Sequence, residues 1–278
     1  MRPARAITAT ASAIAVAVSF ALGAVACAPE PTPAAEEPST PSTKAETPAP
    51  PVLEPVDPTG AADPAGPGSA SDARSDALPQ HSIDDPSSLW VVTNKHRPLD
   101  PLDYEPSDLV IPEGIDNVNG QPLRAEAAAA ATRMAQAASA DGVWFRIGSA
   151  YRDYARQEYL YTSYIARDGQ AEADTYSARP GFSEHQTGLT ADFDDASSCY
   201  LWACFADTAA GAWLAEHAAE HGWILRYPAG SEHVTGYTFE PWHFRYVGEP
   251  LALEMRERGV ATLEEYFELA AAPTYLDE

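Results

Sequence analysis

The stretch Ser183-Glu-His185-Gln-Thr-Gly188-Leu-Thr-Ala-Asp192 sets an imidazole and a carboxylate on either side of a glycine. Gly188 allows the chain to turn sharply after His185, because glycine adopts positive φ angles without steric cost. A strand from Leu189 onward would then bring Asp192 back toward the same point. The stretch therefore predicts that one His and one Asp side chain face a common centre.

A second stretch, Glu240-Pro-Trp-His243, supplies another carboxylate and another imidazole. Pro241 disfavours a helix here, so we expect Glu240 to precede His243 in an extended or turning segment, unlike the helical metalloprotease pattern. A catalytic zinc ion takes three His or carboxylate ligands and keeps one position open. The candidate ligands are His185, Asp192 and His243, and the Glu240 carboxylate could face a metal-bound water. By residue type alone, each of these side chains could equally be a surface group or a satisfied core group.

Residues 1–27 have the layout of a secretory signal, with Arg2 and Arg5 before a small, apolar run. The run ends at Ala24-Val-Ala-Cys27, which is similar to the lipobox of bacterial lipoproteins, so Cys27 is expected to carry a lipid. Lipoboxes usually have a larger aliphatic residue where Ala24 stands, which leaves a cleaved signal peptide or an uncleaved anchor as alternatives. We expect an exported lipoprotein at the outer face of the cell membrane, or else a secreted or N-terminally anchored protein.

Residues 28–80 consist mainly of Pro, Ala, Glu, Ser and Thr, and they hold 13 of the 25 prolines of the chain. A segment with so few large apolar side chains cannot offset its ordering entropy. Proline favours extended conformations, so we predict a disordered, semi-rigid stalk that lifts the folded part off a membrane.

Residues 81–278 contain every Trp and Tyr of the chain and are expected to form one domain. The chain carries 17 Lys and Arg against 41 Asp and Glu, a formal net charge of −24, and the excess of acids extends through this region. So acidic a surface repels phosphate backbones, which argues against a nucleic-acid partner. We expect a monomer.

Cys199 and Cys204 lie close together in the chain, in Ser-Cys-Tyr-Leu-Trp-Ala-Cys. In an exported protein, a short-loop disulfide is the natural interpretation. Zinc ligation by thiolates is the alternative, but two cysteines alone would leave such a site half built.

The periodicity and capping signals predict helices early and strands late, which favours an α+β fold with a small antiparallel sheet flanked by helices. Asp141-Gly142 is expected to end the first helix, Asp153 to cap the second, and Thr208 and Thr262 to cap the later ones. The expected helices are 125–140, 153–167, 208–221 and 263–271, and the expected strands are 143–147, one from Leu189 onward, 223–227, 235–239 and 244–247.

The combined pattern of His-x2-Gly-x3-Asp and a downstream Glu-x2-His resembles the VanY-type D-alanyl-D-alanine carboxypeptidases and their VanX dipeptidase relatives. The resemblance extends over most of residues 90–268. It includes Ser149-Ala-Tyr-Arg152, Gln157, the stretch from Ser177 to Gly188, Arg226-Tyr-Pro, and the segment from Thr235 to Gly248.

This resemblance implies one Zn²⁺ per chain, bound by His185, Asp192 and His243, with Glu240 as general base. Arg152 is implied to face the substrate, and Gln157 and Ser183 to line the substrate pocket. The implied substrate is a peptidoglycan stem peptide that ends in D-Ala-D-Ala. Two alternatives remain: an L,D-carboxypeptidase that acts on tetrapeptide stems, and a wall-binding module that has lost catalysis. For Arg152, a structural ion pair is a further alternative.

His217-Ala-Ala-Glu-His221 matches an inverted zincin motif on the predicted helix 208–221. The helix is expected to stop at Gly222, directly after His221. We interpret both histidines as part of a solvated face opposite Trp213, and not as metal ligands.

Overall fold

The computed structural model describes residues 80–276. The predicted export signal, Cys27 and all but the last residue of the predicted stalk lie outside this range. Within the range, no helix is long and apolar enough to cross a membrane.

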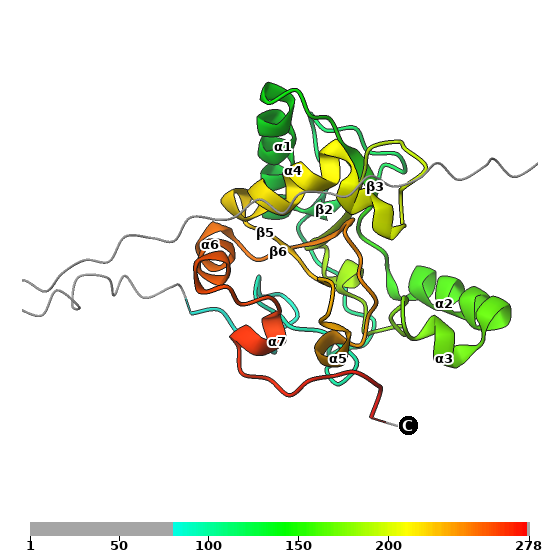
Figure 1. The fold of residues 1–278 in the computed structure, drawn as a ribbon. Helices are drawn as coiled ribbons and strands as arrows, with labels where there is room; N and C mark the ends of the chain where they lie inside the picture. The colour runs from blue at the N-terminus through cyan, green and yellow to red at the C-terminus, as the bar shows by residue number, and fades with distance from the viewer. Residues whose placement is uncertain (1–79, 277–278) are drawn as a thin grey trace, which may run out of the picture. The chain divides into compact units, whose positions relative to one another are not determined.

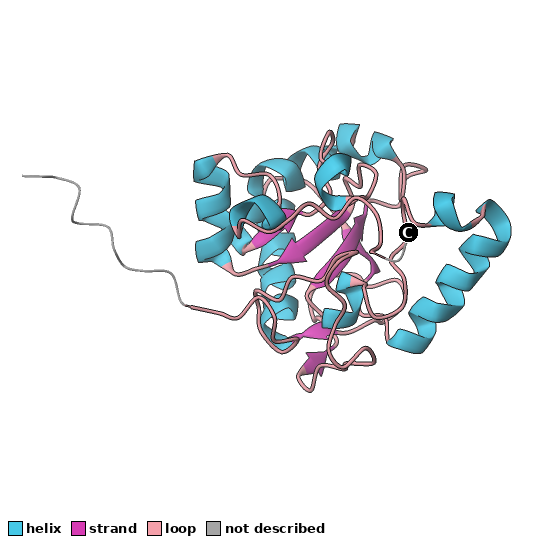
Figure 2. Cartoon of the chain, turned by 90° about the horizontal axis from the view of Figure 1, so that it is seen from below, coloured by secondary structure: helices cyan, strands magenta, loops and turns pink. Residues whose placement is uncertain are grey.

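The centre of the fold is a four-stranded antiparallel sheet with the order β3-β4-β6-β5, which Figure 2 shows with helices around it. A separate two-stranded antiparallel sheet joins β1 to β2. This arrangement confirms the predicted α+β class. The strands are β1 (Leu109–Val110), β2 (Leu123–Arg124), β3 (Arg146–Ser149), β4 (Thr190–Asp194), β5 (Trp223–Leu225) and β6 (His243–Tyr246).

The two faces of the central sheet differ in chemistry, because side chains alternate along a strand. In β4, Ala191 and Phe193 enter the main hydrophobic core. Phe244 and Tyr246 of β6 do the same. The intervening residues of both strands are polar or charged, and all of them are buried. They are Thr190, Asp192, Asp194, His243 and Arg245.

Two helices cover the apolar face of the sheet. Buried alanines and Met134 of α1 pack in the main core together with Trp213 and Leu214 of α4, and α2 and α3 lie together away from α1 and α4 (Figure 1). The α-helices are α1 (Ala125–Ala140), α2 (Tyr154–Asp168), α3 (Gln170–Ala173), α4 (Ala209–His217), α5 (Glu232–Thr235), α6 (Glu249–Arg258) and α7 (Leu263–Tyr266). The 3₁₀ helices are η1 (Glu184–Thr187), η2 (Ala203–Asp207) and η3 (Ala218–His221).

Local signals predicted the early helices well. The Asp153 side chain caps α2 by accepting a hydrogen bond from the Arg156 amide, and Gly169 follows its last residue. Thr208 caps α4 in the same way. The predicted helix 208–221 is α-helical only to His217 and continues as η3 up to Gly222.

Four elements differ clearly from the sequence prediction. The prediction of a strand at 235–239 is wrong, because α5 ends at Thr235 and Gly236 adopts a φ of 78° that turns the chain. The strand expected at 143–147 begins later, at Arg146. The closing helix ends at Tyr266 instead of residue 271, and α6 was not predicted at all.

Candidate metal centre and catalytic cleft

Strand pairing and one turn bring His185, Asp192 and His243 together. Asp192 of β4 lies directly opposite His243 of β6 in the antiparallel register. His185 belongs to η1, which ends at Gly188 in the left-handed conformation, with φ at 67°. The chain then enters β4, so the turn and the strand expected from the sequence are both present.

The three potential ligand atoms converge in a buried space. Asp192 Oδ1 lies 3.4 Å from His185 Nε2 and 3.2 Å from His243 Nδ1. Two ligand atoms of a tetrahedral zinc ion with bonds of about 2.0–2.1 Å are separated by about 3.3 Å. Asp192 Oδ1 is buried without a hydrogen-bond partner, as expected of an atom that binds a cation. Within residues 80–276, this is the one group of His, Cys, Asp or Glu side chains arranged to hold a metal ion, and it fits zinc.

The ring of His185 is held in the orientation that a ligand needs. Its Nδ1 lies 2.7 Å from the carbonyl oxygen of Ala150. A carbonyl oxygen only accepts, so Nδ1 donates and Nε2 presents its lone pair to the centre. Burial, together with the nearby Arg152 charge, lowers the pKa of His185 to about 4, which keeps the ring neutral.

The carboxylates around His243 favour a positive charge at the centre. Burial opposes the charged ring, yet contacts with Asp192 and Glu184 raise the pKa of His243 to about 9. A bound cation would be stabilised by the same carboxylates that favour protonation of His243.

Glu240 reaches the centre through a tight turn. The His243 amide donates to the carbonyl of Glu240, with Pro241 between them, and the Glu240 amide donates to the carbonyl of Tyr227. Glu240 Oε2 lies 3.4 Å from His243 Nδ1. Burial raises the pKa of Glu240 to about 8. The turning segment expected from Pro241 is therefore present, and it places a carboxyl group beside the three candidate ligands.

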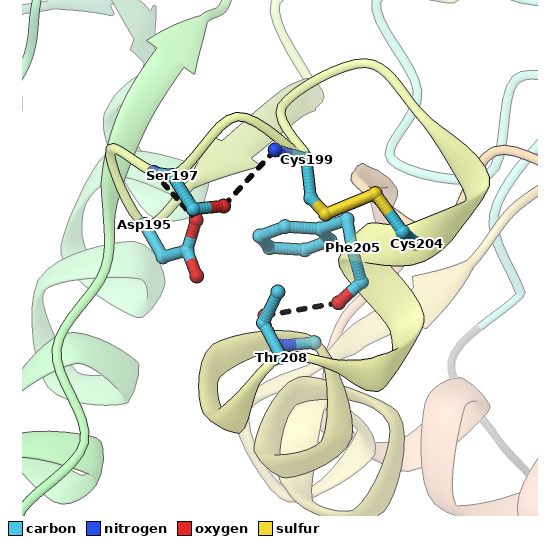
Figure 3. Close-up of a disulfide and its surroundings, with 7 residues drawn as sticks. Asp195, Ser197, Cys199, Cys204, Phe205 and Thr208 are labelled. Atoms are coloured by element: carbon cyan, nitrogen blue, oxygen red, sulfur yellow. Dashed lines mark hydrogen bonds between the residues drawn. A yellow bond between two sulfur atoms is a disulfide. The ribbon is translucent and has the colours of Figure 1, made fainter. Parts of the chain in front are cut away.

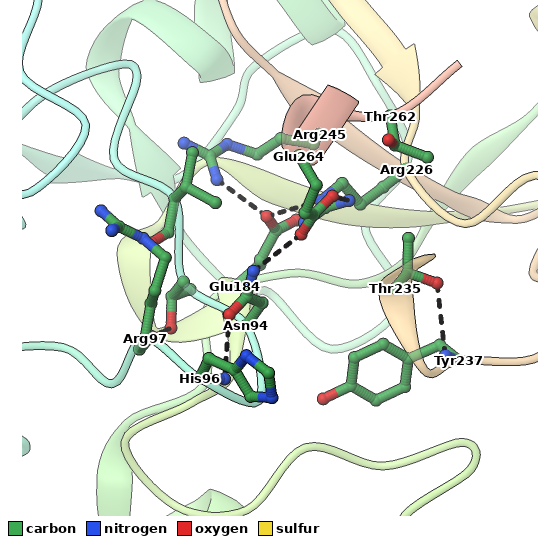
Figure 4. A network of polar contacts seen from close by, with 12 residues as sticks. Asn94, His96, Arg97, Glu184, Arg226, Thr235, Tyr237, Arg245, Thr262 and Glu264 are labelled. Atoms are coloured by element: carbon green, nitrogen blue, oxygen red, sulfur yellow. Dashed lines mark hydrogen bonds and ion pairs between the residues drawn. The ribbon is translucent and has the colours of Figure 1, made fainter. Parts of the chain in front are cut away.

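Glu184, Arg226, Arg245 and Glu264 form a buried network of charges (Figure 4). Glu184 Oε1 accepts hydrogen bonds from Arg226 Nε at 2.8 Å and from Arg245 Nη1 at 3.1 Å. Arg226 also forms a two-pronged ion pair with Glu264. All four side chains are fully buried. Glu184 Oε2 lies 3.8 Å from His243 Nε2, so the network presents a fixed carboxylate to the outer nitrogen of the ring.

Sequence reasoning missed this network. Glu184 is adjacent to His185 within the quoted stretch, but nothing in the local pattern shows that Arg226, Arg245 and Glu264 meet it in the core. The alternation of polar and apolar residues in β6 was the available signal, because it places Arg245 on the same face as His243.

A cleft of about 1200 Å³ opens over the centre and includes the three candidate ligands and Glu240 in its lining. Arg152 and Ser183 line it as well, as expected from the resemblance. Gln157 does not line it. This side chain is buried and donates to the carbonyl of Ala178 at 2.6 Å, so it supports the wall of the cleft from behind.

Arg152 is held close to the centre by its backbone, whose amide donates to the carbonyl of His185. Within residues 80–276, no carboxylate forms an ion pair with its guanidinium, and its buried Nε has no hydrogen-bond partner. The alternative role for Arg152, a structural ion pair, is therefore not what the structure shows. The free guanidinium can bind a negative group that enters the cleft.

The inverted zincin motif does not form a metal site. His217 stacks on Trp213, with ring centroids 4.8 Å apart, and His221 lies 6.2 Å from the same ring. The expectation that these histidines lie opposite Trp213 is thus wrong. His217 instead contacts the side chains of Glu216 and Glu220 at 3.9 and 3.6 Å.

Comparisons with known proteins agree with this site. The VanY family model, described as D-alanyl-D-alanine carboxypeptidase, matches residues 120–249. The YodJ protein of Bacillus subtilis strain 168, named as a carboxypeptidase, is 39% identical over 192 residues, which cover 67% of this chain and 70% of YodJ.

Two solved structures are similar across most of the described region. The LdcB LD-carboxypeptidase has a TM-score of 0.62 and 39% identity, and the match covers 66% of this chain and 88% of that one. The VanY D,D-pentapeptidase of a VanB-type resistance cassette, solved with Zn(II), has a TM-score of 0.55 and 29% identity, and the match covers 66% of this chain and 99% of that one. The fold, the cleft and these similarities define a metallopeptidase. The chain belongs to the VanY family of D-alanyl-D-alanine carboxypeptidases.

Proposed function

We propose that this protein is a zinc-dependent D-alanyl-D-alanine carboxypeptidase that removes the terminal D-alanine from peptidoglycan stem peptides. The observation that carries the proposal is that His185, Asp192 and His243 each offer one potential ligand atom, all within 4.8 Å of one another, in an open cleft. The intact set of three potential ligands and Glu240 argues against the alternative of an inactive wall-binding module.

In this proposal His185, Asp192 and His243 would hold one zinc ion, which when bound would polarise the scissile carbonyl and lower the pKa of a water molecule. A bound cation would lower the pKa of Glu240 again, so that its carboxylate can accept a proton from the attacking water and return it to the leaving amine. Arg152 neutralises negative charge on the substrate or on the oxyanion that develops during attack. Ser183 contributes to the wall of the pocket, and Gln157 supports that wall.

A second candidate function is that of an L,D-carboxypeptidase, which would remove D-alanine from the shorter tetrapeptide stem. It is favoured by the similarity to LdcB, since the identity to that LD-carboxypeptidase is 39% against 29% for the VanY D,D-pentapeptidase. Purified protein should be incubated with pentapeptide and tetrapeptide stems, and the products weighed by mass spectrometry. Loss of alanine from the pentapeptide supports the first function. Loss from the tetrapeptide alone supports the second.

The proposed roles of Glu240 and His185 can be separated by substitution. Glu240→Ala should retain zinc, while activity falls by about 10²–10⁴, as is typical when general acid–base catalysis is lost. His185→Ala should lose both zinc and activity, because two protein ligands hold the ion too weakly. His217→Ala is the matched control and should change neither. Loss of zinc from the His217 variant, with zinc retained after His185→Ala, would overturn the assignment.

We further propose that the protein is exported and held at the outer face of the membrane by a lipid on Cys27. The support is the sequence of residues 1–27. Cys27→Ser should move the protein from the membrane fraction to the soluble fraction. An unchanged membrane fraction would instead favour an anchor formed by the uncleaved N-terminal segment.

A further inference from the structure

The loop between β4 and α4, residues 195–208, holds two apolar side chains at the edge of the catalytic cleft. Leu201 is 47% exposed and Trp202 is 69% exposed. Both line the same cleft as the candidate metal ligands. Large apolar groups exposed beside a substrate cleft favour contact with a ligand over contact with water.

The loop is braced from within (Figure 3). A disulfide joins Cys199 to Cys204, and the Cys199 amide donates to Ser197 Oγ at 3.1 Å. Phe205 is fully buried next to the disulfide. The Thr208 hydroxyl closes the other end by donating to the Phe205 carbonyl at 2.9 Å. The tip that carries Leu201 and Trp202 is therefore fixed at both ends.

Tyr200 ties the same loop to the central sheet. A Cβ atom at position 148 would lie 2.6 Å from the Tyr200 ring, so this ring packs directly on the backbone of Gly148 in β3. Tyr200 lines the cleft together with Asp192 and Arg152. Leu201, the next residue, has a φ of 61°, a left-handed conformation that residues with a Cβ rarely adopt. The fold thus holds the tip beside the cleft in a conformation that local preference disfavours.

The position of the tip limits which part of a substrate it can touch. Trp202 follows Tyr200 by two residues, which span at most about 7 Å of extended chain. An extended peptide advances about 3.3 Å per residue, so the same distance corresponds to about two residues of substrate. Tyr200 packs on Gly148, and the next residue, Ser149, pairs with Asp192 across β3 and β4. A group bound at Trp202 therefore lies within a few residues of the scissile bond along an extended stem peptide.

We propose that Trp202 and Leu201, presented by the Cys199–Cys204 loop, form a binding subsite for stem-peptide residues on the amino side of the scissile bond. The subsite contacts the aliphatic part of those residues and so selects for stem peptides over shorter D-alanyl peptides. This inference rests on the proposed function.

The test compares two substrates that share the scissile bond: the pentapeptide stem and N-acetyl-D-Ala-D-Ala, which lacks the upstream residues. Trp202→Ala should lower kcat/KM for the pentapeptide at least about fivefold, mainly through KM, because one well-placed aromatic contact contributes that much or more. The value for the short peptide should stay unchanged. Replacement of Cys199 and Cys204 by Ser should produce the same length-dependent loss. If the stem that is cleaved is the tetrapeptide, it replaces the pentapeptide in the comparison.

Trp144→Ala is the matched control, because Trp144 is also a half-exposed tryptophan, at 49%, but does not line the cleft. Equal losses on both substrates, or no loss after Trp202→Ala, would overturn the subsite. If the wild-type protein cleaves neither stem, the proposed function fails, and calorimetric titration of the pentapeptide into the zinc-loaded Glu240→Ala protein then tests the subsite alone. If Trp202→Ala, added to Glu240→Ala, weakens pentapeptide binding and Trp144→Ala does not, the subsite is supported. Equal binding by all three proteins refutes it.

Discussion

Replacement of Glu184 by Gln should damage both stability and metal binding, although Glu184 is not among the candidate ligands. Its carboxylate lies between two fully buried guanidinium groups and accepts a hydrogen bond from each, at 2.8 and 3.1 Å. Glu184→Gln keeps the shape and removes the charge, so Arg226 and Arg245 are left with one carboxylate, that of Glu264, in the same core.

The expected loss can be worked from this geometry. Removing one partner of a buried ion pair costs about 3–5 kcal/mol, because the remaining charge stays desolvated. The Gln oxygen still accepts one hydrogen bond, so we expect the lower end, about 3 kcal/mol. For a domain of this size each kcal/mol lowers Tm by about 2–4 °C, which predicts a fall of roughly 6–12 °C. Zinc affinity should fall about 10- to 100-fold, since the carboxylate that faces His243 Nε2 has lost its charge.

Thermal melts of the zinc-free protein measure the first effect, and competition with a chelating dye measures the second. The matched control is Glu220→Gln, which breaks a pair with Arg256 in which both side chains are nearly half exposed. An exposed pair contributes at most about 1 kcal/mol, so Tm should move little. If Glu184→Gln melts like the wild type and binds zinc equally well, the network neither stabilises the core nor orients His243, and the reasoning is refuted.

Three further predictions concern the core, a close backbone approach and the metal. Met134→Ala removes a fully buried side chain of α1 and should lower the free energy of unfolding, measured with denaturant, by about 2–5 kcal/mol. The zinc content should stay unchanged, because α1 packs in the core on the apolar face of the sheet. Gly211→Ala should destabilise by about 1–3 kcal/mol or more, because the new Cβ would overlap the carbonyl oxygen of Phe205 and α4 would have to shift; an unchanged melt contradicts this. Removal of zinc by a chelator should lower Tm reversibly, since a ligand at a concentration of 1,000 times its Kd stabilises the folded state by about 4 kcal/mol. A Tm that changes neither with chelator nor with added zinc would contradict the prediction that metal binding stabilises the fold.

The helices could be predicted where their signals are local. The alanine-rich sequence of α1 and the caps of α2 are decided within one or two turns of chain, and the structure agrees with the sequence there. The strand expected at 235–239 failed for the opposite reason. Its residues have high β-propensity, but Gly236 turns the chain, and Tyr237 packs against Tyr227 with ring centroids 4.6 Å apart. Tertiary packing of this kind overrides β-propensity, and it cannot be predicted from a short stretch of sequence.

For the site, the family resemblance joined the stretches around His185 and His243, and the sequence by itself predicted the turn at Gly188 and the turning segment from Glu240 to His243. These features depend on short stretches in which residue type and spacing restrict the backbone. Only the tertiary structure decided that Asp192 and His243 face each other across β4 and β6, and that a carboxylate of Glu184 lies behind His243. The physical reason is the sequence separation of the partners: Glu184 meets Arg226 and Arg245 at separations of 42 and 61 residues, and only the folded sheet brings such distant charges into one buried network.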